Sequence, residues 1–164
     1  MITIHCVGSP EASLQIDVET LEGATLNGLN LHRAILERQS LRRASLRRAN
    51  LRGAFLYGSD LTGADLSEAN LMTADLRTAQ LKGAILHRSY LLGAMLQSVD
   101  LRDADLEGAD LDHAHLEEAR LQGANLRCVD LDKAFLQGAV YDERTQWPDG
   151  FEPEQYGAVK ALRT

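Results

Sequence analysis

The sequence predicts a repeat solenoid, in which one short backbone unit recurs and stacks on its neighbours to build a continuous core. Three observations lead to this fold class. Leucine occupies every fifth position from Leu21 to Leu136 without any change of register. Alanine lies two positions before most of these leucines, with Glu19, Leu29 and Gln39 among the exceptions. All three prolines, at positions 10, 148 and 153, lie outside the repeat, where a missing N–H does not interrupt a ladder of hydrogen bonds.

The spacing of five excludes both regular backbones. In an α-helix a step of five rotates a side chain by about 140°, so the leucines would scatter around the cylinder. In a flat strand an odd step sends alternate leucines to opposite faces. The pattern is satisfied if the chain turns a corner once per repeat, so that each segment points its leucine toward a common axis. The small residue two positions earlier then fits beside the leucine.

The run Ala-Asp/Asn-Leu, seen as Ala64-Asp65-Leu66, Ala69-Asn70-Leu71 and Ala104-Asp105-Leu106, resembles the pentapeptide-repeat family. The resemblance covers residues 19–138 and implies an all-β fold, a right-handed quadrilateral β-helix. In that fold four pentapeptides make one coil, the leucine and the small residue point inward, and the other three positions face solvent. The family pattern implies about six coils over this range.

The chain divides into three parts. Residues 1–13 are predicted to form an N-terminal cap, because Ile2 and Ile4 alternate with polar residues before a break at Gly8-Ser9-Pro10. Residues 14–138 form the β-helix, and Ile16 already holds the leucine register. Residues 139–164 form a C-terminal cap that is similar to the endings of many bacterial, notably cyanobacterial, family members. Pro153 is expected to start a short helix over 154–162, which either caps the last coil or serves dimerisation. The residues expected to cover the last leucines are Trp147, Phe151, Tyr156, Val159 and Leu162.

The composition limits the kinds of partner and the cellular location that we expect. The net charge of −7 argues against direct nucleic-acid binding, which normally needs a basic surface. No apolar run approaches the ~20 residues that span a bilayer, and the N-terminus lacks the pattern of a signal peptide. Cys6 and Cys128 lie far apart and do not indicate a disulfide framework. We therefore expect reduced thiols, a cytoplasmic location and no membrane association.

No group of residues predicts catalysis, a cofactor site or a metal site. Histidines 113 and 115 lack third and fourth metal ligands, and Cys128 has no identifiable base. The Asp and Asn residues before the leucines recur as part of the repeat and do not face one another across a cleft. Ten glycines share the last repeat position, which indicates corners and not a phosphate loop. The protein is therefore predicted not to be an enzyme.

The outward positions carry two features. An apolar stripe follows two adjacent faces, and such patches often mark interfaces, although self-association or simple tolerance explains them equally well. Charge is also banded: residues 39–58 hold five arginines and no acid, whereas residues 99–118 carry a net charge of −7. The stripe comprises Ile35, Phe55, Tyr57, Met72, Tyr90, Leu92, Met95 and Phe135, and the basic band comprises Arg42, Arg43, Arg47, Arg48 and Arg52.

These features favour a non-enzymatic protein–protein interaction module. Its partner is a protein of unidentified kind, or a second copy in a homodimer. The resemblance supplies an alternative, because quinolone-resistance members of the family bind type II topoisomerases as rods charged like duplex DNA. Such mimicry needs negative potential along most of the rod, and the basic residues at 39–58 oppose it.

Overall fold

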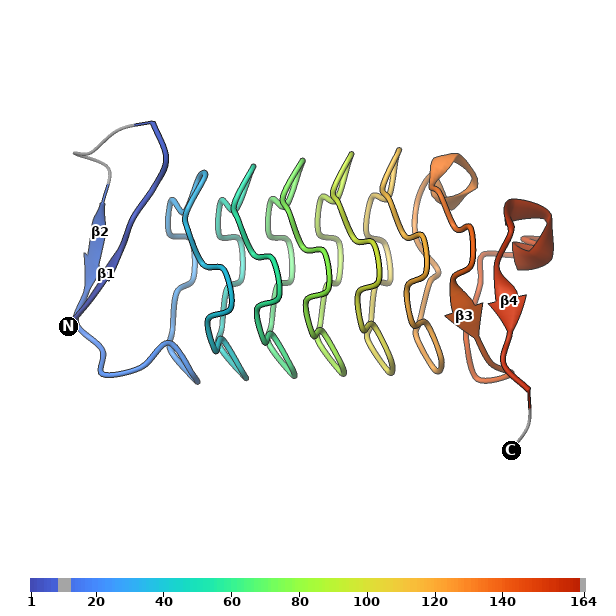
Figure 1. The fold of residues 1–164 in the computed structure, drawn as a ribbon, viewed down its shortest axis with the longest axis horizontal. Helices are drawn as coiled ribbons and strands as arrows, with labels where there is room; N and C mark the ends of the chain where they lie inside the picture. The colour runs from blue at the N-terminus through green and yellow to red at the C-terminus, as the bar shows by residue number, and fades with distance from the viewer. Residues whose placement is uncertain (9–12, 163–164) are drawn as a thin grey trace.

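The chain forms a rod of stacked coils with a hairpin at its N-terminal end (Figure 1). The structure, a computed structural model, describes residues 1–8 and 13–162. Along the rod, parallel backbone bridges join residues that are twenty positions apart, as in the series Asn50, Asn70, Tyr90 and Asp110. Four five-residue segments therefore complete one circuit of the axis. The predicted β-helical solenoid is confirmed at this level.

The leucines line the axis because the backbone points each of them inward. Leu71, Leu76 and most of the others have no solvent exposure, and the alanines two positions earlier are buried beside them. The Leu71 amide donates to the Tyr90 carbonyl in the next coil at 2.8 Å, and the Ala74 amide donates back to the Leu71 carbonyl at 3.0 Å. Burial of the side chain and pairing of the backbone therefore occur at the same residue.

The second residue after most of the leucines forms the corner. At these positions φ is positive, at 64° for Gly83 and 54° for Arg43, and a hydrogen bond closes the four-residue turn. A positive φ at this place is the signature of a type II turn, which explains why glycine recurs there.

The Asp or Asn before the leucine also serves the corner. The Asp60 carboxylate, for example, accepts the Thr62 amide at 3.0 Å, and Asn70 accepts the Met72 amide at 3.1 Å. These Asp and Asn side chains are thus turn-forming groups.

The N-terminal hairpin covers the first coil. Strand β1 (Ile2–Ile4) pairs antiparallel with β2 (Leu14–Ile16), and Ile4 is buried. The His5 carbonyl accepts the Ile35 amide at 2.7 Å, which occupies an edge that would otherwise be unpaired. The predicted start of the β-helix at residue 14 is wrong, because Leu14–Ile16 belongs to this hairpin and the regular bridges begin at Thr25. The predicted break at Ser9 and Pro10 lies outside the described residues.

The backbone slips by one residue near the C-terminal end, although the leucine spacing does not change. Val129 occupies the position opposite Asp110 that Asp130 was expected to take. The left-handed corner has moved from Cys128 to Asp130, which has φ 56°, and the short 3₁₀ helix η2 (Leu131–Lys133) follows. Aspartate enters the left-handed region more readily than most other residues, so the corner forms there instead of at cysteine.

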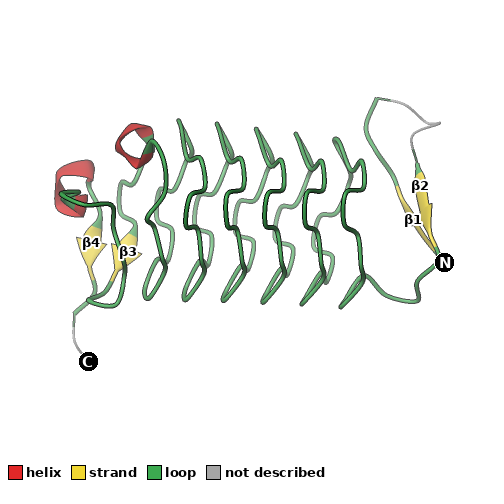
Figure 2. Ribbon diagram, turned by 180° about the vertical axis from the view of Figure 1, so that it is seen from behind, coloured by secondary structure: helices red, strands yellow, loops and turns green. Residues whose placement is uncertain are grey.

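The helix predicted over 154–162 is wrong. The chain forms one 3₁₀ turn, η3 (Pro153–Tyr156), which stops at Gly157 with φ 84° (Figure 2). Strand β4 (Val159–Lys160) then pairs parallel with β3 (Val140–Tyr141), so the ladder continues past the predicted end at residue 138.

The aromatic residues of the C-terminal segment stack on the end of the core. Trp147 and Phe151 have ring centroids 5.4 Å apart, and Phe151 and Tyr156 4.6 Å apart. Val159 and Leu162 were expected to join them, but they are exposed, because the strand at 159–160 takes the place of the predicted helix.

Candidate interaction surface

The apolar candidate residues lie on two adjacent faces of the rod, whereas Arg42, Arg43, Arg47 and Arg48 follow leucines of the other two faces. Residues directly before and after each leucine point outward, because side chains alternate along each short segment. We call the residues that flank Leu31, Leu51, Leu71, Leu91 and Leu111 the Tyr90 face. We call those that flank Leu36, Leu56, Leu76, Leu96, Leu116 and Leu136 the Phe55 face. The Tyr90 face holds three of the predicted stripe residues and the Phe55 face holds the other five.

Polar groups interrupt the stripe on the Phe55 face. Ile35 and Phe55 are bridged neighbours, but Asp75 lies between Phe55 and Met95. The Arg77 guanidinium lies 2.6 Å from the Asp75 carboxylate and 5.7 Å from the centre of the Tyr57 ring. Its hydrogen bond lowers the pKa of Asp75, against the opposing effect of burial.

The stripe residues on this face therefore form two groups separated by an ion pair. At the C-terminal end of the face, Phe135 stacks on His115 with ring centroids 4.7 Å apart.

The Tyr90 face has an apolar centre and charged ends. Met72 and Leu92 occupy successive coils. A hydrogen bond of 3.0 Å from the Thr73 amide to the Leu92 carbonyl joins these coils. Tyr90 lies before Leu91 on the same face and is 53% exposed. Arg52 lies toward the N-terminal end of the face, and Asp110 and Asp112 lie toward its other end. The full set comprises one column of Asn30, Asn50, Asn70, Tyr90 and Asp110, and a second column of His32, Arg52, Met72, Leu92 and Asp112.

Most of the basic band pairs with the next coil. Arg42 contacts Asp60 at 2.8 Å, Arg47 contacts Asp65 at 3.3 Å, and Arg48 contacts Glu68 at 2.9 Å. Ion pairs of this exposed kind contribute little to stability. Within the described part of the chain, Arg43 and Arg52 are the two members of the band without an ion pair. The expected concentration of free positive charge at 39–58 is therefore reduced.

The acidic residues at 99–118 are also partly neutralised by ion pairs. Asp100 contacts Arg102 at 2.6 Å and Asp103 contacts Arg144 at 3.0 Å. Residues Asp105, Glu107, Asp110 and Glu118 have no cationic partner among the described residues. Within these two bands, the charges without an ion pair are thus basic at 39–58 and acidic at 99–118.

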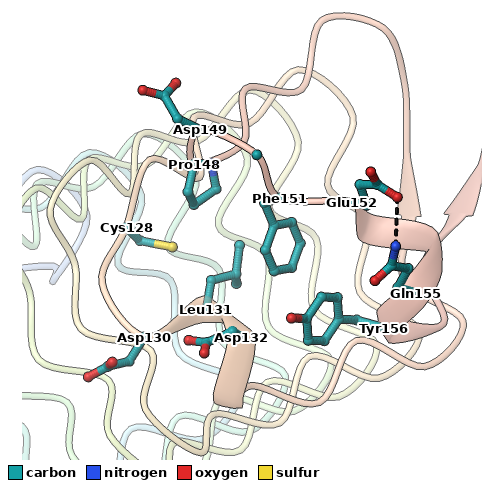
Figure 3. A pocket seen from close by; sticks show the side chains of 11 residues that line it. Cys128, Asp130, Leu131, Asp132, Pro148, Asp149, Phe151, Glu152, Gln155 and Tyr156 are labelled. Carbon is teal, nitrogen blue, oxygen red and sulfur yellow. Dashed lines mark hydrogen bonds between the residues drawn. The ribbon is translucent and has the colours of Figure 1, made fainter.

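A cavity of about 330 Å³ opens where the backbone slips near the C-terminal end (Figure 3). Phe151 and Tyr156 form one wall with Leu131, and the carboxylates of Asp130 and Asp149 point away from the rings. Burial raises the pKa of the Cys128 thiol to about 12, so this thiol is not a nucleophile near neutral pH.

Two of the histidines have acidic neighbours. His113 contacts Asp112 at 2.7 Å and His115 contacts Glu117 at 3.1 Å. In the residues that the structure describes, no cluster of three or more His, Cys, Asp and Glu side chains could hold a metal ion. The same residues contain no helix long and apolar enough to cross a bilayer.

The repeat itself decides the family. A family model for pentapeptide repeats matches residues 40–77, 74–112 and 104–140. The chain belongs to the pentapeptide repeat family. No curated protein matches the sequence.

Several solved pentapeptide repeat structures are similar to this chain. HetL, which is involved in heterocyst differentiation regulation in the cyanobacterium Nostoc, is 26% identical over 82% of this chain and 71% of its own, with a TM-score of 0.49. Rfr23 from the cyanobacterium Cyanothece is 29% identical over 76% of this chain and 88% of its own, with a TM-score of 0.43. QnrB1, a plasmid-mediated fluoroquinolone resistance protein, is 16% identical over 87% of this chain and 84% of its own, with a TM-score of 0.42.

Sequence reasoning missed two exposed apolar residues in this pentapeptide rod. Ile85 is 42% exposed directly before Leu86, on neither of the two stripe faces, and Val129 is 52% exposed beside the slip. The position of Ile85, directly before a leucine, is a signal that could have found it. Val129 occupies an inward position of the repeat, so only the displaced corner reveals its exposure.

Proposed function

We propose that this protein is a non-enzymatic protein–protein interaction module of the cytoplasm. The observation that carries the proposal is the outward placement of apolar side chains on two adjacent faces. Tyr90 is 53% exposed, and Met72 and Leu92 extend the same apolar area on the Tyr90 face. A rod with a closed leucine core has no folding requirement for apolar residues at these positions, and patches of this kind commonly mark interfaces. The free state of Cys6 and Cys128 supports the cytoplasmic assignment.

We also assign to the coil the right-handed quadrilateral winding of the family, with about six circuits over residues 19–138. Parallel bridges between residues twenty positions apart support four sides per circuit. The same bridges continue through Val140, so the final circuit merges with the C-terminal segment.

The charge distribution supports this proposal over DNA mimicry of a type II topoisomerase. A DNA mimic presents negative potential along its length, whereas Arg33, Arg38, Arg43 and Arg52 are exposed toward the N-terminal end of this rod. We expect micromolar protein neither to inhibit gyrase supercoiling nor to protect gyrase from a quinolone. Inhibition or protection at that concentration would favour the mimic.

The experiment that tests the proposal compares three forms of the protein as bait in native lysate. The variant Phe55→Asp plus Leu92→Asp places a charge on each face without touching the buried core. Ile85→Asp is the matched control, because it changes an exposed apolar residue outside the stripe. We expect proteins retained by the unmodified rod to be retained by the control and lost by the double variant. Identical retention by all three forms contradicts the proposal.

A further inference from the structure

The Tyr90 face is complementary to itself when one copy is reversed. Its second column reads Arg52, Met72, Leu92 and Asp112 in successive coils, from a cation through two apolar residues to an anion. A two-fold axis in the plane of the contact, perpendicular to the rod, reverses this column and leaves it facing its own copy. With the axis midway between the coils of Met72 and Leu92, Arg52 meets the partner's Asp112 and Met72 meets the partner's Leu92.

The first column agrees with the same axis. Its order is Asn50, Asn70, Tyr90 and Asp110, as the backbone bridges show. Reversal places Asn50 opposite the partner's Asp110 and Asn70 opposite the partner's Tyr90. Each pair joins an amide to a group that can accept a hydrogen bond. No pair in either column brings like charges together, and the apolar residues meet at the centre.

The charged residues at both ends of this face have few ion pairs within their own chain. Within the described ranges, Arg52 and Asp110 have no ion pair, and Asp112 has only His113 at 2.7 Å and a distant Lys133 at 3.8 Å. The absence of like-charge pairs is not a property of every column on the rod. Reversing the column of Asp60, Gln80 and Asp100 about its middle sets two carboxylates against each other.

We propose that two copies of this chain associate side by side and antiparallel through the Tyr90 face. The inference rests on the proposed function, since it names a second copy as one partner of the same surface. The coils carrying Arg52 and Asp112 lie three strand spacings apart, about 14 Å, so the contact is short. A face of this size places the dimer among the weak, transient interfaces, and it forms at high protein concentration.

Sedimentation velocity over a concentration series tests the proposal. Symmetry repeats the Arg52–Asp112 pair on both sides of the axis, so we expect Arg52→Asp to weaken dimerisation by about tenfold. Asp112→Arg should do the same, and the two changes in one chain should restore the dimer. Arg127→Asp is the matched control, because Arg127 is exposed, has no ion pair in the described part and lies on another face. A monomer at every concentration, or a dimer indifferent to both single reversals, overturns the proposal.

Disulfide trapping tests the orientation. Arg52→Cys and Asp112→Cys are made in separate chains, mixed at high concentration and oxidised, with the unmodified protein as the control for Cys6 and Cys128. We expect cross-linked dimer in the mixture and little in either variant alone. Efficient cross-linking of Arg52→Cys to itself would indicate parallel rods and overturn the antiparallel arrangement. If dimerisation fails while the capture experiment still depends on Phe55 and Leu92, the inference is wrong and the proposed function stands.

Discussion

Adjacent leucines at positions 91 and 92 allow a direct test of the inward register. Leu91 has no solvent exposure, whereas Leu92 is partly exposed on the Tyr90 face. Replacing Leu91 with alanine removes three buried carbons, which costs about 2.4 kcal/mol at ~0.8 kcal/mol per carbon. The leucines above and below it, Leu71 and Leu111, are held by backbone hydrogen bonds of 2.8 and 3.1 Å and cannot close the cavity. The cavity brings the total to about 3–5 kcal/mol.

Leu92→Ala makes the same chemical change one residue later, and we expect it to cost about 1 kcal/mol or less. Urea unfolding followed by circular dichroism measures both free energies of unfolding at 25 °C. The comparison controls for the loss of leucine itself and for any change in the unfolded chain. Equal destabilisation by the two variants, or a larger effect at Leu92, would refute the assignment of inward and outward positions.

Three further predictions concern the corners, the Cys128 thiol and the ion pair between Asp75 and Arg77. Gly83→Ala should cost about 1 kcal/mol in thermal unfolding, because φ is 64° and a Cβ there meets nothing within 4 Å, so only backbone strain acts. At pH 8 iodoacetamide should label Cys6 faster than Cys128, because the pKa of about 12 leaves little thiolate at Cys128; equal rates would contradict this raised pKa. The pKa of Asp75 is lowered in the folded state, so its stabilisation is present above the unfolded pKa near 3.9 and is lost as pH falls through the lower folded value. Asp75→Asn should therefore make acid unfolding less steep below about pH 4, and an unchanged profile would argue against the pair with Arg77.

The sequence predicted the core because the repeat makes every position equivalent to one twenty residues away. Once Leu71 points inward, the same backbone points Leu91 and Leu111 inward, and a step of twenty places Met72 beside Leu92. The faces that carry the candidate surface could be predicted for the same reason.

The parts that the sequence did not predict depend on departures from this equivalence. The slip at Cys128 leaves the leucine spacing intact, so the spacing does not predict it. Pro153 begins a helical turn as expected, but Gly157 ends it after four residues and the exposed edge of β3 captures the following strand. The pairing of Arg42 with Asp60 was missed because it depends on the reach of the arginine side chain from one coil to the next.

The Tyr90 face is the surface through which two copies of this chain associate side by side. Small-angle X-ray scattering of the unmodified protein over a wide concentration range tests this claim most directly. We predict that the cross-sectional radius of gyration increases with concentration while the maximum dimension stays nearly constant, as for two rods lying side by side. A doubling of the maximum dimension would indicate end-to-end contact, and scattering that does not change with concentration would indicate no self-association; either result would contradict the claim.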